Sequence, residues 1–272
     1  MDQGPVTQPR TGLEWRPGGE ARRIERITPR EEAVGLSFDG RPHTVLMATP
    51  ADLQELAIGF AVTEGLAGRD DILDVTERRT AEGVLIDLTL SPAARGRRAR
   101  PRGLEGRSSC GLCGVQRLAD AVRPLPRVIS DRSFRHEAVH RATSAIGELQ
   151  TLGRLTRATH AAAFADASGT LLLAREDVGR HNALDKLAGA LLRGGVDASH
   201  GFVVVTSRCS FEMVEKTARI GCPMIVAVSA PTDLAIRKAE EAGVTLIALA
   251  RADGHAVFSC AERLMAEDHA HV

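Results

Sequence analysis

The chain has 272 residues with a formal net charge of zero, and 43% of its residues are hydrophobic. This is an ordinary globular composition, and the length suffices for a well-buried core in one or two domains. Without net charge, no overall field attracts nucleic acid or an anionic membrane, so neither is expected as a partner. No apolar run reaches the roughly 20 residues that cross a bilayer, and the N-terminal residues lack the apolar core of a signal peptide.

The five cysteines are an odd, scattered set that does not read as a disulfide framework. A reduced, cytoplasmic protein is therefore expected. In that compartment a CxxC pair is more often reactive or metal-binding than structural. Cys110 and Cys113 form such a pair.

Residues 1–25 contain several prolines and glycines and few apolar positions, which predicts a flexible tail. Strands are predicted from Ile27 to Leu46, with a tight hairpin turn at Asp39-Gly40. A helix is predicted next, because Thr49 can cap it and Pro50 suits its first position.

A further strand is predicted at 81–90, and it completes a smaller mixed α+β region over residues 26–94. The composition then changes, because arginine and glycine crowd into the residues that follow. Residues 95–126 are predicted to be a mobile arm that carries the CxxC pair.

Apolar strands and helices alternate regularly in residues 127–262. After a helical stretch at 134–152, strands are expected at 160–165, 170–175, 202–206, 224–229 and 244–249. Helices are expected at 181–193, 210–220 and 232–242. This alternation predicts a three-layer α/β domain with largely parallel strands in its later half, followed by a tail at 263–272.

The motif Cys110-Gly111-Leu112-Cys113 places two sulfurs at a spacing that can share a metal, form a reversible disulfide or carry a persulfide. A helix N-terminus after the motif and the arginines before it would both favour the nucleophilic thiolate. Zinc needs four ligands, and no second CxxC or Cys/His pair is present. A reactive thiol is therefore favoured, with a metal shared between two chains and an incidental pair as alternatives.

The residues His136-Glu137-Ala138-Val139-His140 match the HExxH motif of zinc hydrolases. The extended motif is absent, and Glu148 lies too near in sequence to be the usual third ligand. A chance match on a polar helix face is the favoured interpretation, and no intrinsic metal is predicted.

Residues 175–186, REDVGRHNALDK, join a strand to a helix, where free backbone N–H groups and basic side chains make an anion site. Arg180, His181 and Lys186 are candidates for holding a phosphate or pyrophosphate. The alternative is a plain turn in which Glu176 and Asp177 complement the helix dipole.

Polar residues also follow three later strands. The connections 206–210 and 229–232 are rich in hydroxyls, and such loops gather at the edge of an α/β sheet where ligands bind. The third connection is Leu249-Ala250-Arg251-Ala252-Asp253-Gly254. There Arg251 could hold a phosphate and Asp253 a guanine-type N–H edge, although a hairpin turn explains the same residues.

Several blocks together resemble the formate dehydrogenase accessory sulfurtransferase (FdhD) family. They are SSCGLCG, DVGRHNALDK, TSRCSFEMVEKTARIGCP, AVSAPTDLA and LIALARADGHAVFS, with TPADLQELAIGFAVTEGL nearer the N-terminus. The resemblance extends from about residue 30 to residue 260.

This resemblance implies a sulfur carrier that accepts sulfur from a cysteine desulfurase as a persulfide on the CxxC. The sulfur then passes to the molybdenum bis(molybdopterin guanine dinucleotide) cofactor, bound as a substrate, before the cofactor enters the formate dehydrogenase apoenzyme. By resemblance, Cys110 carries the persulfide and residues 249–254 bind the cofactor. Arg180 and His181 are added as cofactor-binding candidates, and Cys113 as a second catalytic residue. The implied fold is a cytidine-deaminase-like α/β/α domain beside a smaller N-terminal region.

The sequence departs from the family at a few positions. Residues 156–160 replace a glycine pair, and Cys209 stands where the family has a small residue. The zinc ligands of a deaminase are not recognisable, so neither zinc nor deamination is predicted. A homodimer is compatible with an α/β domain of this size. The alternative functions are a cofactor-binding chaperone without cysteine chemistry and an HExxH zinc hydrolase.

Overall fold

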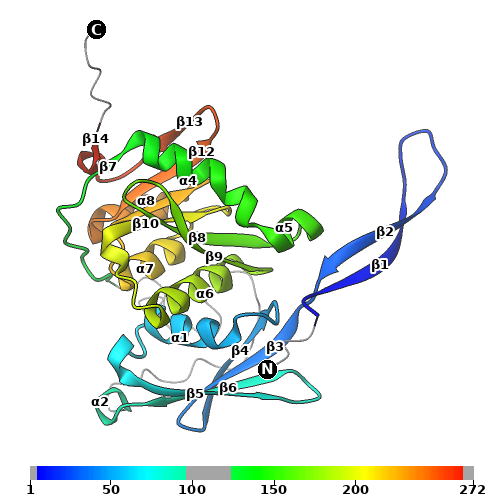
Figure 1. The fold of residues 1–272 in the computed structure, drawn as a ribbon, viewed down its shortest axis with the longest axis horizontal. Helices are drawn as coiled ribbons and strands as arrows, with labels where there is room; N and C mark the ends of the chain where they lie inside the picture. The colour runs from blue at the N-terminus through cyan, green and yellow to red at the C-terminus, as the bar shows by residue number, and fades with distance from the viewer. Residues whose placement is uncertain (1–4, 96–123, 266–272) are drawn as a thin grey trace.

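The structure is a computed structural model that describes residues 5–95 and 124–265. It contains a small N-terminal sheet unit, a larger α/β unit and a hairpin that projects away from both (Figure 1). Cys110 and Cys113 lie outside the described residues. In the part described, no helix combines the length and the apolar character that crossing a bilayer requires.

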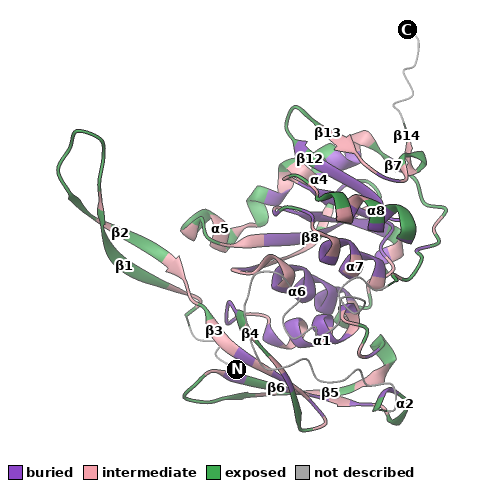
Figure 2. Ribbon diagram, turned by 180° about the vertical axis from the view of Figure 1, so that it is seen from behind, coloured by how far each residue is buried: buried purple, intermediate pink, exposed green. Residues whose placement is uncertain are grey.

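The projecting hairpin consists of β1 (Thr7–Glu14) and β2 (Arg22–Pro29), paired antiparallel along their whole length. The prediction of a flexible tail over residues 1–25 is therefore wrong for this stretch. Pro17, Gly18 and Gly19 lie in the connecting turn, where Gly18 has a φ of 73°, whereas Pro9 lies within β1. Neither strand contains a buried residue, and both are coloured mainly as exposed in Figure 2.

The N-terminal unit is a four-stranded sheet in the order β4-β3-β6-β5, with α1 (Leu53–Thr63) packed on one face. Its strands are β3 (Glu32–Phe38), β4 (Arg41–Ala48), β5 (Ile72–Arg79) and β6 (Val84–Leu90). The turn predicted at Asp39-Gly40 is confirmed, since the two residues have φ values of 49° and 73°. The strand predicted at 81–90 is confirmed as β6. The unit also contains η1 (Arg69–Asp71) and α2 (Pro92–Arg95).

Helix α1 begins later than the sequence suggests. Its N-cap residue is Asp52, with a left-handed φ of 55°, so the prediction of a cap at Thr49 is wrong. Thr49 is instead fully buried, and its N–H donates to Asp177 Oδ2 at 2.9 Å. Its hydroxyl accepts from the Val178 N–H at 3.2 Å. The Thr49 hydroxyl, which could have capped the helix, therefore bonds to the α/β unit instead.

The α/β unit is built on a six-stranded sheet in the order β13-β12-β11-β10-β8-β9. Its strands are β8 (His160–Asp166), β9 (Leu171–Asp177), β10 (Gly201–Val205), β11 (Met224–Ala227), β12 (Thr245–Arg251) and β13 (Gly254–Val257). The parallel pairing predicted for the later half is confirmed for β10, β11 and β12. Strand β8 is antiparallel to both of its neighbours, and β13 is an antiparallel edge strand.

Helices cover both faces of this sheet, which confirms the predicted three-layer arrangement (Figure 1). On one face lie α6 (Arg180–Arg193), α7 (Phe211–Arg219) and α8 (Asp233–Ala242). On the other face lies α4 (His136–Leu149), which buries Val139 and Ile146 against the sheet and is followed by α5 (Thr151–Thr156). Short 3-10 turns occur at η2 (Ala198–His200) and η3 (Ala261–Arg263).

The end of the described chain is also ordered. Leu264–Met265 form β14, which pairs in parallel with β7 (Phe134–Arg135). The prediction of a tail beginning at residue 263 is therefore wrong for these two residues. This pairing fastens the end of the described chain beside the start of α4.

The two units meet where α1 crosses α6 at two glycines. A Cβ atom at Gly59 would lie 1.7 Å from the Asp185 carbonyl oxygen, and one at Gly189 would lie 1.9 Å from that of Glu55. Backbone therefore contacts backbone directly at this crossing, which leaves no room for a side chain.

A buried ionic cluster supports the same interface. The ammonium of Lys216 lies 2.9 Å from Asp185 Oδ1 and 3.1 Å from Glu64 Oε1, and Asp185 also accepts from the Thr63 hydroxyl at 2.6 Å. Burial disfavours the charge on Lys216, but the two carboxylates outweigh burial and raise the pKa of this ammonium. Residues from α1, α6 and α7 therefore share one charge network, and the two units form a single packed body.

Candidate functional site

Four strands of the large sheet end at the same edge. Strands β10, β11 and β12 are parallel, and β9 runs with them because both β9 and β10 are antiparallel to β8. The connections that follow these strands carry the polar residues singled out in the sequence. The carboxyl edge of parallel strands is where α/β proteins bind ligands, so this edge is the candidate site.

Arg180 and His181 begin α6, directly after the turn that follows β9. The side chain of His181 is 11% exposed, and its Nε2 lies 3.9 Å from Glu212 Oε2 at the start of α7. Burial opposes the charge on Glu212, but contacts with His181 and Ser210 outweigh burial and lower the pKa of this carboxyl. The first turns of α6 and α7 thus lie close together at the edge.

His160 is a third basic residue at this edge and was not identified from the sequence. It begins β8 and pairs with Asp177 at the end of β9. Burial lowers its pKa, and the nearby charge of Arg180 lowers it further. Only the antiparallel placement of β8 brings His160 to this edge, so the linear sequence carried no direct signal for it.

Lys186 does not contribute to the site, so its prediction as a phosphate ligand is wrong. Its Nζ lies 2.7 Å from Asp177 Oδ2, and neither side chain has any exposed surface. The same ammonium donates to the Thr49 carbonyl at 2.9 Å. Lys186 faces inward because it lies more than one helical turn after Arg180 and is enclosed by the N-terminal unit.

Asp177 also shapes the turn that presents Arg180 and His181. Its Oδ1 accepts from the Gly179 N–H at 2.8 Å and from Asn182 Nδ2 at 3.1 Å. Asn182 donates in turn to the Met47 carbonyl at 2.8 Å. Asp177, Asn182 and Lys186 of the REDVGRHNALDK block therefore form a buried frame, and Arg180 and His181 are the residues at the candidate edge.

The segment Leu249–Gly254 closes β12 onto β13 at the same edge. Leu249 and residues 251–254 are exposed, which leaves the side chains of Arg251 and Asp253 accessible. The Leu249 N–H donates to the Ser229 carbonyl at 3.1 Å, which ties the segment to the loop after β11. The strand ends therefore place this segment and the Arg180-His181 turn along one edge.

The loops after β10 and β11 are tied together as well. The Cys209 N–H donates to the Ala230 carbonyl at 3.2 Å, and the Thr232 N–H donates to the Cys209 carbonyl at 3.0 Å. Thr232 caps α8, because its hydroxyl accepts from the Ala235 N–H at 3.3 Å. These hydrogen bonds join the loops after β10 and β11 to each other at the candidate edge.

The described cysteines are not activated thiols. Cys209 and Cys222 are fully buried, and burial raises the pKa of each thiol to about 12. Cys260 is partly exposed, and burial and the charge of Glu262 raise its pKa as well. A thiolate is the nucleophilic form, so reactive sulfur has to be sought at the CxxC pair, outside the described residues.

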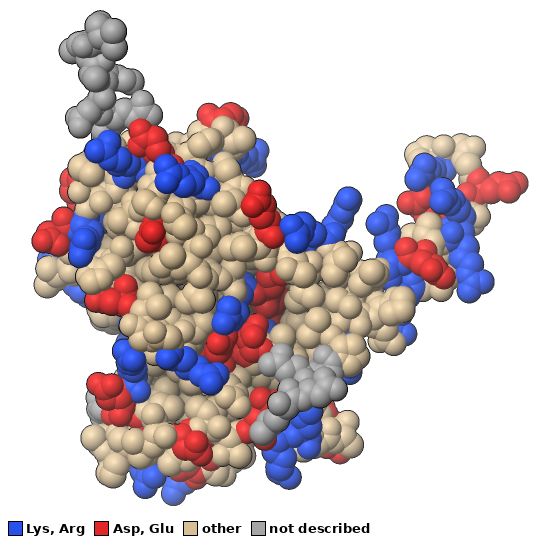
Figure 3. Space-filling view, in the orientation of Figure 1, with Lys and Arg blue, Asp and Glu red and all other residues tan. Residues whose placement is uncertain are grey.

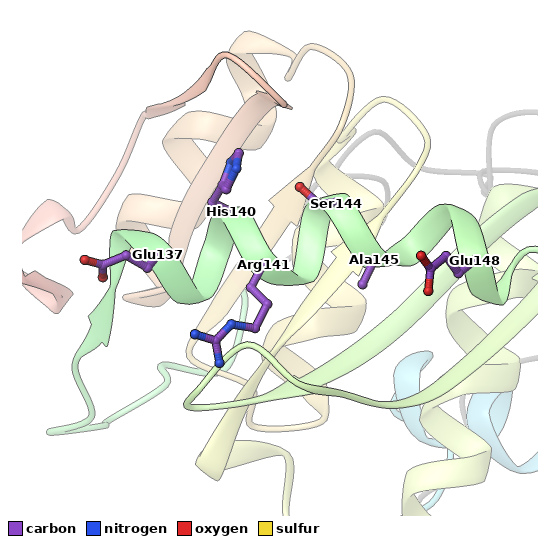
Figure 4. Close-up of a pocket in the computed structure, with 6 residues that line it drawn as sticks. All are labelled: Glu137, His140, Arg141, Ser144, Ala145 and Glu148. Atoms are coloured by element: carbon purple, nitrogen blue, oxygen red, sulfur yellow. The ribbon is translucent and has the colours of Figure 1, made fainter.

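The HExxH residues lie on the first turns of α4. His136 Nδ1 lies 2.8 Å from His255 Nε2 on β13, and the two rings stack with centroids 5.0 Å apart. Figure 4 shows Glu137, His140 and Glu148 pointing in different directions along the helix surface. Within residues 5–95 and 124–265, no three His, Cys, Asp or Glu side chains converge as a metal-binding group would.

Comparison with known proteins bears on what this edge serves. The model of the FdhD/NarQ family matches residues 29–265. This chain belongs to the FdhD/NarQ family. Sulfur carrier protein FdhD of Agrobacterium fabrum is 46% identical over 89% of this chain and 90% of its own length. Its counterpart of the same name from Variovorax paradoxus is 47% identical over 86% of this chain and 85% of its own length.

The family resemblance drawn from the sequence blocks is thereby confirmed. A crystal structure of a protein from Desulfotalea psychrophila, assigned as a formate dehydrogenase accessory protein, shares the fold with a TM-score of 0.75. It covers 96% of this chain and 100% of its own length at 24% identity. The FdhD/NarQ fold thus accounts for nearly the whole chain.

Proposed function

We propose that this FdhD/NarQ protein is a sulfur carrier that takes sulfur from a cysteine desulfurase and delivers it to a molybdenum cofactor. The acceptor would be the bis(molybdopterin guanine dinucleotide) form, bound as a substrate and destined for formate dehydrogenase. The observation that carries the proposal is the conjunction of a CxxC pair with a basic sheet edge in a chain whose relatives are named sulfur carriers.

The first step is sulfur uptake. The Cys110 thiolate attacks the outer sulfur of a persulfide on the desulfurase, forming an S–S bond on Cys110 and releasing the desulfurase cysteine as a thiolate. No net oxidation occurs, because one S–S bond replaces another. A thiolate is required for this attack, and the arginines of residues 95–107 would favour it. Cys113 would assist by exchanging with the persulfide as a second thiol.

The second step is delivery. The terminal sulfur leaves for the metal as a neutral atom, Cys110 returns as a thiolate, and the reduced metal supplies the two electrons that make the sulfur a sulfido ligand. Delivery without a free sulfur species requires that the cofactor be held beside the cysteine while transfer occurs.

The carboxyl edge of the large sheet has the groups that such a cofactor needs. The guanine dinucleotide portions carry pyrophosphates, and the guanidinium of Arg251 offers parallel N–H donors for a phosphate. The carboxylate of Asp253 can accept from the N–H edge of guanine. At the N-terminus of α6, Arg180 adds positive charge and His181 adds an imidazole ring beside a second phosphate group.

Individual side chains have to attract the anionic cofactor, because the chain as a whole has no net charge. On the face shown in Figure 3, basic and acidic side chains are interspersed and no broad basic field appears. An anionic cofactor is therefore recognised by specific contacts at the sheet edge and not by general charge.

The competing function is a cofactor-binding chaperone whose cysteines do no chemistry. The carrier and chaperone functions are distinguished by measuring formate dehydrogenase activity in cells that lack the gene for this protein and carry a variant copy of it. A carrier predicts loss of activity with Cys110→Ala and with Arg251→Ala. A chaperone predicts loss with Arg251→Ala alone. Retention of activity by the Cys110→Ala/Cys113→Ala double variant would contradict the carrier.

A further inference from the structure

The turn that carries residues 249–254 is weakly held by its own backbone. The β12–β13 ladder is interrupted between Ala248 and Arg251. Leu249 has a φ of 54°, a conformation that costs a non-glycine residue free energy, and Gly254 has a φ of 147°. Such a turn keeps one conformation only if contacts from outside the hairpin fix it.

One such contact comes from α4, the helix that covers one face of the sheet. His255 directly follows Gly254, and its Nε2 lies 2.8 Å from Nδ1 of His136, the first residue of α4. The two rings are nearly parallel, with 18° between their planes. Both residues are partly buried, so water competes only partly for this hydrogen bond.

We propose that His136 is a positioning residue that holds the 249–254 turn in its ligand-binding conformation through its hydrogen bond to His255. This inference rests on the proposed function, because it takes residues 249–254 as the segment that binds the guanine nucleotide end of the cofactor. It gives the first histidine of the HExxH motif a role that requires no metal.

The contact is sensitive to protons. A hydrogen bond between two ring nitrogens requires that one carry a proton and the other be bare, so it is lost when both imidazoles are charged. The charged groups acting on His255 are His136 and His140, both on α4. Burial, followed by these two charges, lowers the pKa of His255. The contact is therefore intact at neutral pH and breaks on acidification.

The direct test is hydrogen–deuterium exchange of the backbone amides of residues 249–257 in the full-length protein without ligand. At pH 7.5, His136→Ala should raise their exchange about fivefold, the effect of losing one ordinary hydrogen bond. His136→Asn, whose amide lies near the position of Nδ1, should restore part of the protection. His140→Ala is the matched control on the same helix, and exchange in the segment should stay at the wild-type rate.

A second measurement connects the contact to binding. Guanosine diphosphate affinity, measured by calorimetry, should fall about fivefold in His136→Ala, less in His136→Asn and not at all in His140→Ala. When exchange at each pH is corrected for its intrinsic rate, wild type and His136→Ala should converge once acidification charges both imidazoles. Equal exchange of wild type and His136→Ala at pH 7.5 would overturn the inference. Altered exchange with no nucleotide binding by wild type would instead count against the proposed cofactor segment, and would overturn the link to ligand binding.

Discussion

Lys186 Nζ lies 2.7 Å from Asp177 Oδ2, and both side chains are fully buried. This ion pair joins the end of β9 to α6, and its two members also bond to the backbone of Thr49 in the N-terminal unit. The pair therefore fixes the turn that presents Arg180 and His181, and it does so without touching the ligand edge itself.

Replacing Lys186 with alanine should strongly destabilise the protein. Removing one partner leaves the Asp177 carboxylate buried without its counter-charge, which costs about 3–5 kcal/mol in comparable pairs. Urea denaturation of wild type and Lys186→Ala measures this loss. The Asp177→Asn/Lys186→Met double variant should lose less than the single variant, since it leaves no buried charge. A single-variant loss below about 1 kcal/mol would contradict the assignment of this pair as a structural frame.

Adding a methyl group at Gly59 should disrupt the contact between the two units. The new Cβ would lie 1.7 Å from the Asp185 carbonyl oxygen, so α1 and α6 would have to separate. The expected loss in unfolding free energy is at least about 1–3 kcal/mol. Gly147→Ala on α4 is the matched control, because nothing beyond its own helix backbone lies within 4 Å of its added Cβ. The control should be neutral or gain about 0.5–1 kcal/mol from helix propensity.

The alternating strands and helices of residues 160–249 were predictable from the sequence, because their apolar segments are separated by short polar connections. The β1–β2 hairpin was not predictable by the same reasoning, since its strands bury no residue and have no apolar alternation. The roles of Thr49 and Lys186 depend on contacts between residues 128 to 137 positions apart, which local patterns do not encode. His160 lies at the candidate edge because β8 is antiparallel to β9, which the local sequence does not encode.

Acidification should destabilise the fold through His160. Burial and the charge of Arg180 lower its folded-state pKa, so the unfolded chain binds the proton more readily. The stabilising contribution is present above the unfolded pKa of about 6.5 and is lost as the pH falls through the lower folded value. Thermal unfolding followed from pH 7.5 to pH 5.5 measures the decline. His160→Gln should reduce the slope, and an unchanged slope would show that His160 does not titrate in this way.

Thiol reactivity should divide the cysteines into two classes. Cys209 and Cys222 are buried with pKa values of about 12, so iodoacetamide should leave them unmodified in the native protein. Cys110 and Cys113 should be modified first, and Cys260 slowly because its thiol pKa is raised. Peptide mapping by mass spectrometry gives the order. Early modification of Cys209 would contradict its buried position.

Intact mass after incubation with a cysteine desulfurase and cysteine tests the central claim most directly. A persulfide adds one sulfur atom, so wild type should gain increments of about 32 Da that dithiothreitol removes. Cys110→Ala should lose the gain, whereas the matched control Cys260→Ala should keep it. Absence of the increment in wild type, or equal increments in Cys110→Ala, would contradict the assignment of Cys110 as the sulfur carrier.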